Sequence, residues 1–158
     1  MKQKGDMSVE EALKKEPGIL AQRALTFTKV MRDIVASAKN NPDFGPHSWN
    51  PLAEVVDTKN YARIGIWKEY VKGWDEYTKL LCDWARLSKW EPRVRRISEQ
   101  PGYVFQELIE FGEYEEHGMK DEIFSLTVFE FNGENKIVHM DVYMQREQVP
   151  VPKGTWEV

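Results

Sequence analysis

The sequence has few of the residues from which proteins build covalent or metal-bound sites. Its 158 residues include one cysteine, Cys82, so an internal disulfide is excluded. Three histidines and this cysteine occur at none of the short spacings that are typical of zinc sites. Gly-x-Ser-x-Gly elbows, phosphate-binding loops and dinucleotide fingerprints are also missing. We therefore expect no cofactor, and no metal held by a local motif.

Long apolar runs and clusters of one charge are missing as well. No apolar run reaches 18 residues, and no charged-then-apolar leader occurs. The 22 basic and 26 acidic residues are well mixed and give a net charge of −4, so no basic stripe can follow a phosphate backbone. We expect neither membrane nor nucleic acid as a partner. Because the lone thiol fits a reducing compartment, we also expect a cytoplasmic location.

The sequence is rich in apolar and aromatic residues. Apolar residues make up 41% of the chain and aromatic residues 12%, with six tryptophans. This content and length suit one ordinary core, so we expect a single domain over residues 1–158, with residues 1–7 disordered. Large rings mostly fill cores, but they also line pockets for apolar or ring-shaped ligands.

The first half of the chain is predicted to be mainly helical. A capping box that begins at Ser8 starts a short helix. Apolar residues recur at helical spacing through 19–38 and again through 73–88. Between these helices, the composition predicts a loop at 39–51 and a short strand at 52–56.

From Trp90 onward the hydrophobic period is two, which is typical of β-strands. Residues 90–98 are predicted as an edge strand, because their proline cannot donate to a ladder. His-Gly and Asn-Gly turns then join three strands at 103–115, 121–131 and 136–146. Helices followed by an antiparallel meander predict an α+β domain, with helices packed on one face of a curled antiparallel sheet.

One acid interrupts an apolar row in the first of these three strands. In the stretch YVFQELIEFGEY, residues 103–114, Glu107 shares its parity with two phenylalanines, a tyrosine and an isoleucine. A two-residue His-Gly turn pairs Glu107 with Val128, and Val128 with Met140 in the next hairpin, so the apolar rows form one continuous face. Because a carboxylate on such a face is costly unless it is paired, hydrogen-bonded or protonated, Glu107 is either a working group or a structural ion pair with an arginine such as Arg23.

The other parity collects polar side chains. This face is predicted to be solvated or to form a homodimer interface, because apolar residues are mixed into it. Alternate residues of one strand lie about 7 Å apart, so a His-Asp relay is feasible there, although an interface role is favoured. With a different strand register this face would line the interior instead. Its members are Gln106, Glu110, Ser125, Thr127, His139, Asp141 and Tyr143.

The order of elements resembles the NTF2-like superfamily, in its SnoaL-like or ketosteroid-isomerase-like branch. Two or three helices precede a long curled sheet that ends in VFEFNGENKIVHMDVYMQ. The chain departs from the family pattern at Gln145, where an acid frequently closes the last strand, and by two additional turn residues, Glu134 and Asn135. The matching residues of the last hairpin are Phe131, Gly133, Lys136, Ile137 and Tyr143.

The resemblance implies a cone-shaped α+β barrel with a cavity between the helices and the concave face, which often holds a small apolar ligand. Members include isomerases, cyclases, dehydratases, epoxide hydrolases and binding modules, and many dimerise through the other face of the sheet. The homodimer expected here would use the face of His139, Asp141 and Tyr143. The expected ligand-binding residues are Trp49, Phe27, Tyr77, Trp84, Phe105, Val128 and Met140, of which Trp49 is alternatively a buried anchor of its loop.

The leading interpretation is a small cofactor-independent enzyme, a lyase, isomerase, cyclase or hydrolase, that transfers a proton on an apolar or ring-containing molecule. Glu107 is the first catalytic candidate, because a carboxyl in a water-poor cavity has a raised pKa. Asp57 and Tyr61 are the second, since a phenol beside a carboxylate can polarise a carbonyl while the acid moves a proton. Asp57 is alternatively the cap of an ordinary turn. The alternative function is a non-catalytic small-molecule-binding or scaffold module of the same fold.

Overall fold

The structure is a computed structural model that describes residues 6–114 and 119–145. The predicted His-Gly turn, and residues 1–5 of the predicted disordered start, lie outside the described residues. Met7 was expected to belong to that disordered start, but it forms an antiparallel bridge with Val94. The elements of the first half are α1 (Val9–Leu13), α2 (Ile19–Ser37), η1 (Ala38–Asn40), η2 (Pro46–Glu54), β1 (Ala62–Ile64), β2 (Tyr70–Lys72) and α3 (Trp74–Leu87). The second half forms β3 (Ser88–Gln100), β4 (Tyr103–Tyr114), β5 (Met119–Phe131) and β6 (Ile137–Gln145).

The helices form where the apolar spacing predicts them. The capping box is present, with Ser8 accepting from the amide of Glu11 and the Glu11 carboxylate accepting from the amide of Ser8. Helix α2 buries a stripe that begins at Leu20 and ends at Val35, and α3 buries one from Trp74 to Ala85. Both stripes join one core cluster with the concave side of the sheet, where the rings of Phe27 and Phe129 meet edge to face at 5.7 Å.

The strand predicted at residues 52–56 is wrong. Prolines at 46 and 51 fix φ near the helical value, and the segment forms the 3-10 helix η2 instead. Only Val56 reaches the sheet, through a single parallel bridge to Ile137. Trp49 is fully buried in this segment, and its indole N–H donates to Cys82 Sγ at 3.3 Å, so it anchors the segment in the core.

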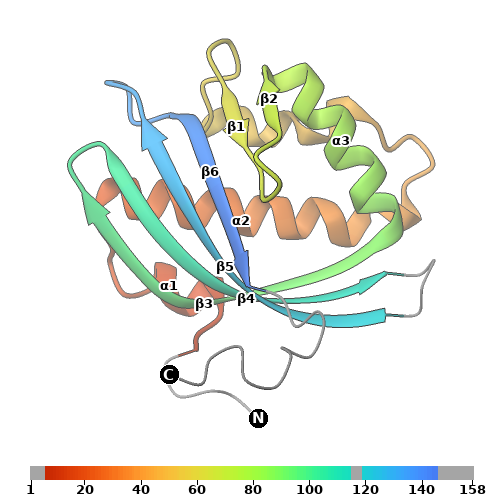
Figure 1. Cartoon of the computed structure of the whole chain (residues 1–158), viewed down its shortest axis with the longest axis horizontal. Coiled ribbons are helices and arrows are strands. Elements are labelled where there is room, and N and C mark those ends of the chain that lie inside the picture. Colours follow the sequence, from red (N-terminus) through yellow and green to blue (C-terminus); the bar gives the residue numbers. More distant parts are fainter. Residues whose placement is uncertain (1–5, 115–118, 146–158) are drawn as a thin grey trace, which may run out of the picture.

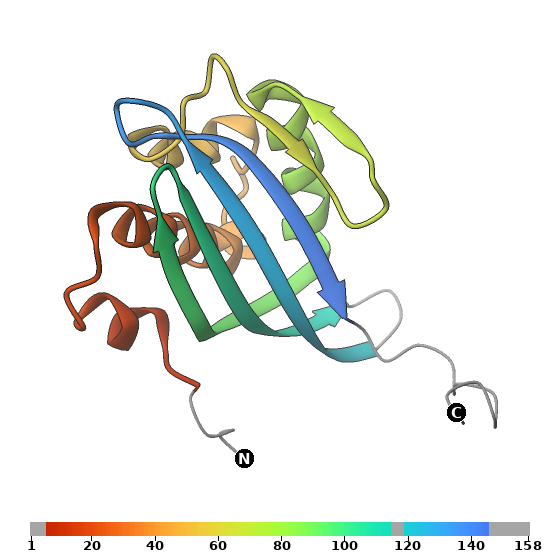
Figure 2. The same ribbon diagram turned by 60° about the vertical axis from the view of Figure 1, so that its left-hand side comes forward.

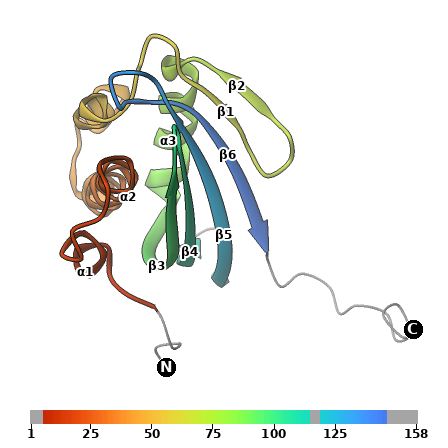
Figure 3. The ribbon, with the colours of Figure 1, turned by 90° about the vertical axis from the view of Figure 1, so that its left-hand side faces the viewer.

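Within the described residues, six strands form one curled sheet in the order β2-β1-β6-β5-β4-β3 (Figure 1). The strand β3 lies at the edge, as its proline predicts. The sheet is mixed, because β1 runs parallel to β6 while the other neighbours are antiparallel. Figure 2 shows how the β1–β2 hairpin extends the sheet beyond β6, and Figure 3 shows α1 and α2 on one side of the sheet. The predicted α+β class, with helices packed on a curled sheet, is confirmed.

The strands of the meander are confirmed, but their register differs from the prediction. Across β4 and β5, Glu107 pairs with Leu126 rather than with Val128, a shift of two residues that preserves the facing. Across β5 and β6, Met140 pairs with Phe129 rather than with Val128, a shift of one residue that exchanges the faces.

This shift decides which row of β4 faces the helices. The even-numbered residues from Gln106 to Gly112 line the cavity between the sheet and the helices, whereas Phe105 and Phe111 of the odd row are 38% and 41% exposed; Ile109 of that row is buried but does not line the cavity. The prediction that the apolar row of Glu107 faces the interior is therefore wrong. Gln106, Ser125 and Thr127, predicted for the outer polar face, are instead buried on the concave side.

Candidate functional site

A cavity of about 350 Å³ lies between the concave face of the sheet, α2, α3 and the β1–β2 hairpin. This volume is in the range of small-molecule sites. Most of its wall is apolar or aromatic, including Trp84 and Trp90, whose rings meet edge to face at 5.5 Å. The polar residues of the wall are Thr28, Arg63, Glu69, Tyr77, Gln106, Glu110 and Thr127.

Glu110 is the partly buried acid of this cavity. Strand β4 carries it on the same face as Gln106, and Trp90 on the edge strand donates its indole N–H to Glu110 Oε1 at 2.6 Å. Burial raises the pKa of Glu110 above its ordinary value of 4.5, and the Ser125 hydroxyl, the Trp90 N–H and the charge of Arg63 offset part of that rise. Ser125 Oγ itself is buried and makes no hydrogen bond of standard geometry. The carboxyl therefore favours its protonated form more than an exposed glutamate does.

Gln106 places a fixed amide in the same wall. Its Nε2 donates to Thr28 Oγ1 at 2.9 Å, and the Thr28 hydroxyl in turn donates to the carbonyl of Ala24 at 3.2 Å. Because the only hydroxyl hydrogen of Thr28 goes to Ala24, Thr28 Oγ1 can only accept from Gln106, which fixes the orientation of the amide. Gln106 Oε1 is buried without a hydrogen-bond partner in the described part of the chain.

Tyr77 and Arg63 complete the polar part of the wall. The Arg63 guanidinium lies over the Tyr77 ring, 5.4 Å from its centroid. Burial raises the pKa of Tyr77, while the charge of Arg63 lowers it in part. The phenol therefore stays protonated at neutral pH and can donate a hydrogen bond.

Glu107, the first catalytic candidate from the sequence, does not line the cavity. It lies on the convex face, where Arg96 binds it with two nitrogens, and the Nη2–Oε1 distance is 2.7 Å. The Arg96 side chain is 68% exposed and that of Glu107 28% exposed. Glu107 therefore forms an ion pair with an arginine at the surface. This agrees with the alternative expectation of a structural ion pair, although the partner is Arg96 and not Arg23.

Asp57 and Tyr61, the second candidates, have separate partners. The Asp57 carboxylate accepts from Asn60 Nδ2 at 3.0 Å and from Asn132 Nδ2 at 3.1 Å, and these bonds, that of Asn60 first, lower its pKa. The Tyr61 hydroxyl is buried against Met140 Sδ at 3.3 Å, and burial raises its pKa far above the ordinary value. Neither residue belongs to the described cavity wall. The contacts of Asp57 are those of a turn cap.

The predicted ligand-binding residues divide into two groups. Those on the helices and on β6 line the cavity: Phe27, Tyr77, Trp84 and Met140. Phe105 and Val128 are cross-strand neighbours on the convex face, and Trp49 is an anchor in the core. The first four remain candidates for ligand contact.

His139 and Asp141, at alternate positions of β6, form the His-Asp contact that was expected from the sequence to be feasible. His139 Nε2 lies 2.8 Å from Asp141 Oδ1. They and Tyr143, which is 58% exposed, lie on the convex side of β6, away from the cavity. This facing agrees with the prediction.

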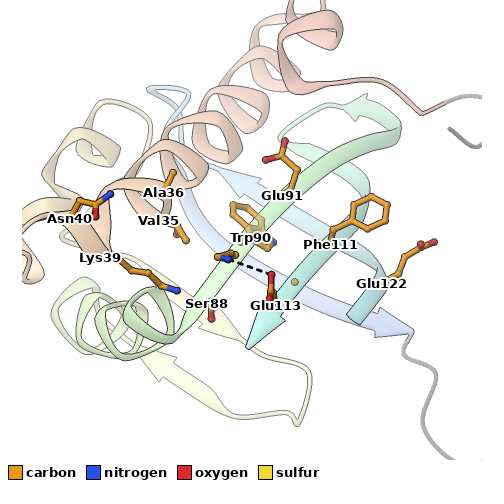
Figure 4. Close-up of a pocket in the computed structure, with 12 residues that line it drawn as sticks. Val35, Ala36, Lys39, Asn40, Ser88, Trp90, Glu91, Phe111, Glu113 and Glu122 are labelled. Carbon is orange, nitrogen blue, oxygen red and sulfur yellow. Dashed lines mark ion pairs between the residues drawn. The ribbon is translucent and has the colours of Figure 1, made fainter. Parts of the chain in front are cut away.

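A larger and more open groove of about 810 Å³ adjoins the cavity, and Trp90 and Gly112 line both. Figure 4 shows Trp90 on β3, with Val35 of α2 to one side and Phe111 of the sheet to the other. Its rim carries the ion pair of Lys89 and Glu113 at 3.5 Å. The cavity is the better candidate site, because Glu110, whose pKa is raised, lies in its wall.

Two kinds of feature are missing from the described part of the chain. Within residues 6–114 and 119–145, three or more His, Cys, Asp or Glu side chains nowhere gather in a group that could hold a metal ion. Over the same residues, no helix has the length and apolar content needed to span a membrane.

The sequence interpretation missed Glu110, Gln106, Trp90 and Arg63 as residues of the site. The first two were assigned to the outer face, and their roles depend on partners far away in the chain. One local signal was available. Thr28 follows Phe27 directly in the apolar stretch of α2, and a hydroxyl beside a predicted core residue can accept a hydrogen bond from a polar side chain of the sheet, as it does from Gln106.

Comparison with solved structures identifies the fold. No family model and no curated protein matches the sequence. An NTF2-like protein of unknown function from Exiguobacterium sp. 255-15 matches with a TM-score of 0.58 and 10% identity, over 75% of this chain and 98% of that chain. A hypothetical protein with a ketosteroid isomerase-like fold from Catenulispora acidiphila, in complex with trimethylamine, matches with a TM-score of 0.53 and 10% identity, over 69% and 79%.

A third match is an LEH-like epoxide hydrolase from M. tuberculosis, with a TM-score of 0.52 and 13% identity, over 74% of this chain and 84% of that chain. At these identities the likeness concerns the fold, and it agrees with the element order and the curled sheet described above. The chain therefore has the NTF2-like fold, in the form found in ketosteroid isomerase-like and SnoaL-like proteins.

Proposed function

We propose that the protein is a small cofactor-independent enzyme that transfers a proton on an apolar or ring-containing small molecule, with Glu110 as the acid or base. The observation that carries this proposal is the partly buried carboxyl of Glu110 in a mainly apolar cavity, with its pKa raised by loss of solvent. A carboxyl whose pKa lies closer to neutrality can both accept and return a proton at physiological pH.

The neighbours of Glu110 have supporting roles in this proposal. The Trp90 N–H holds Oε1 and so fixes the orientation of the carboxyl in the cavity wall. The Tyr77 phenol, which stays protonated, can stabilise negative charge that develops on a substrate oxygen. Apolar walls exclude water and strengthen these interactions. An isomerase, lyase, cyclase or hydrolase each requires such a proton transfer.

The names of two structural neighbours are compatible with this class of reaction. One has a ketosteroid isomerase-like fold, and the other is an epoxide hydrolase. Ketosteroid isomerisation, after which the first fold is named, and epoxide hydrolysis both move a proton on a small molecule. This support is indirect, since fold alone does not select a reaction.

The experiment is a panel of cyclic ketones and epoxides incubated with the protein in D₂O and followed by NMR. We expect deuterium at the carbon beside a carbonyl, or diol from an epoxide, for at least one member. Glu110→Gln should lower that rate by about 10²–10⁴-fold, the usual contribution of general acid–base catalysis. Turnover that Glu110→Gln leaves unchanged would contradict the assignment of the acid.

A second candidate is a non-catalytic binding module that uses the same cavity. The observation in its favour is the apolar wall, together with the outward pairing of Glu107 with Arg96. Saturable binding of panel members, read by tryptophan fluorescence, with no turnover of any of them would favour this candidate.

We further propose a cytoplasmic homodimer that forms through the convex face of the sheet. Four large apolar side chains on this face are 38% to 58% exposed, and such a group of exposed apolar side chains is typical of an interaction surface. The hydrogen-bonded pair of His139 and Asp141 lies on the same face. Phe105→Glu should then convert a dimer to a monomer in analytical ultracentrifugation. A wild-type monomer at micromolar concentration would remove this proposal. The four side chains are Tyr103, Phe105, Phe111 and Tyr143.

A further inference from the structure

The only cation in the described cavity wall is Arg63. It lies in the middle of β1, opposite Met140 of β6, and its side chain is 18% exposed. Its guanidinium packs over the buried ring of Tyr77. The charge is therefore fixed at one end of a mainly apolar cavity, since β1 and its hairpin form that part of the wall.

This cation is weakly paired. Its contact with a carboxylate is to Glu69, with an Nη1–Oε1 distance of 3.6 Å, and the Glu69 side chain is 43% exposed. Arg63 Nε is buried without a hydrogen-bond partner in the described part of the chain. Arg63 is close enough to lower the pKa of Glu110, yet no hydrogen bond of standard geometry joins these two described residues. A guanidinium in such surroundings is stabilised by a carboxylate that binds two of its nitrogens.

The hairpin holds Glu69 where an external carboxylate could take its place. Glu69 Oε2 accepts from the amide of Trp67 at 2.7 Å, while its Oε1 lies towards Arg63. Gly65 leaves the space for this, because a Cβ on that residue would overlap the Glu69 carboxylate. The space beside the guanidinium therefore fits a carboxylate group. It is occupied by the carboxylate of Glu69, whose side chain is 43% exposed.

We propose that the cavity binds a ring-containing carboxylate, whose carboxylate group displaces Glu69 from Arg63 while its ring lies against the apolar wall. This inference deepens the proposed function, because it names the substrate class of the same cavity. The charge favours a carboxylate over a phosphate ester, since one guanidinium without a second cation in the described wall suits a single negative charge. Glu69 then acts as an internal competitor that keeps the site neutral when it is empty.

The test compares two probes of equal shape, 2-naphthoate and 2-naphthamide, by isothermal titration calorimetry at pH 7. We expect the carboxylate to bind at least about tenfold more tightly than the amide, because a charge-assisted pair replaces a neutral contact. Raising the salt concentration should weaken the binding of 2-naphthoate and leave the binding of 2-naphthamide unchanged. Equal affinities, or no binding of either probe at millimolar concentration, would overturn the proposal.

Three variants locate the effect, each checked for folding by its thermal melt. Arg63→Met keeps the apolar stem over Tyr77, and it should reduce the ratio of the two affinities to about one. Glu69→Gln removes the competitor, so it should tighten binding of the carboxylate and leave the amide unchanged. A preference that survives Arg63→Met, or that Glu69→Gln weakens, would also overturn the proposal.

The third variant, Glu110→Gln, separates this inference from the proposed function. It should leave the preference for 2-naphthoate in place even where it abolishes proton transfer. If the wild type shows no preference for 2-naphthoate but has turnover that depends on Glu110, the carboxylate site is refuted and the proposed enzyme is not. A clear preference with no turnover by the wild type would refute the enzyme and leave the carboxylate site standing.

Discussion

Two acids three residues apart on β4, Glu107 and Glu110, have opposite environments. Glu107 points from the convex face and is bound by the exposed guanidinium of Arg96. Glu110 faces the cavity, is held by the Trp90 indole and has a pKa raised by burial. Side chains alternate across a strand, so an odd separation places two identical groups on different faces. The comparison shows that burial and partners, rather than residue type, make one of them suitable for proton transfer.

The same division separates the aromatic residues of the sheet. Phe129 on β5 is 1% exposed and packs against Phe27 of α2, whereas Phe105 on β4 is 38% exposed on the convex face. One phenylalanine therefore contributes to the core of the protein, and the other is available to a partner.

The largest expected effect is on activity. Glu110→Gln should lower the rate of any proton-transfer reaction by about 10²–10⁴-fold, because the amide keeps the shape of the side chain but cannot exchange a proton. Glu107→Gln is the matched control and should retain the wild-type rate. The measurement is NMR-detected turnover of an active member of the ketone and epoxide panel. An equal loss in both variants would contradict the different roles assigned to Glu110 and Glu107.

The next effect is on folding stability. Phe129→Ala should lower the free energy of unfolding by about 3–5 kcal/mol, because it empties a packed site in the core. Phe105→Ala should cost about 1 kcal/mol or less in the monomer, because its ring already contacts water. Urea denaturation of the two variants, at a protein concentration where each is monomeric, gives both numbers. Similar losses of unfolding free energy in the two variants would contradict the assignment of Phe129 to the core and of Phe105 to the solvent-exposed face.

A smaller effect concerns the pH dependence of stability. The folded pKa of Glu110 lies above its unfolded value near 4.5, so the group stabilises the folded state fully below that pH. This contribution is lost as pH rises through the folded pKa. Glu110→Gln should therefore remove part of the decline in Tm from pH 4.5 upward, while Glu107→Gln should not. Melts followed by circular dichroism from pH 4 to 8 test this, and parallel curves for wild type and Glu110→Gln would contradict it.

The smallest effect on stability comes from Glu10, whose pKa is lowered rather than raised. Hydrogen bonds from Arg32 lower the pKa of Glu10 to about 2, with an Nη1–Oε2 distance of 3.1 Å. A lowered pKa stabilises the folded state above the unfolded value and loses that contribution as pH falls towards 2. Because the Glu10 side chain is 42% exposed, Glu10→Gln should cost about 1 kcal/mol or less at pH 7. The cost should vanish in melts at pH 2, and a cost that persists there would point to lost packing instead.

Much of the fold follows from local patterns. The capping box at Ser8, the apolar stripe of α2 and the proline of the edge strand β3 each depend on residues close together in the chain, and each was predicted correctly. The strand expected at 52–56 failed because the 3-10 helix η2, which begins at Pro46, continues to Glu54.

The sequence by itself determined which residues of each strand share a face, because the period of two follows from backbone geometry. It did not determine which face turns inward. On β4 the row with Phe105 and Phe111 is the more apolar one, yet the row with Gln106 and Glu110 faces the cavity, where Thr28 of α2 and Trp90 of β3 hydrogen-bond to its polar side chains. Only the tertiary structure brings these partners together. It also sets the one-residue register shift of the last hairpin, near the irregularity at Glu130 and Phe131, which accompanies the placing of Glu110 rather than Glu107 on the cavity side of the sheet.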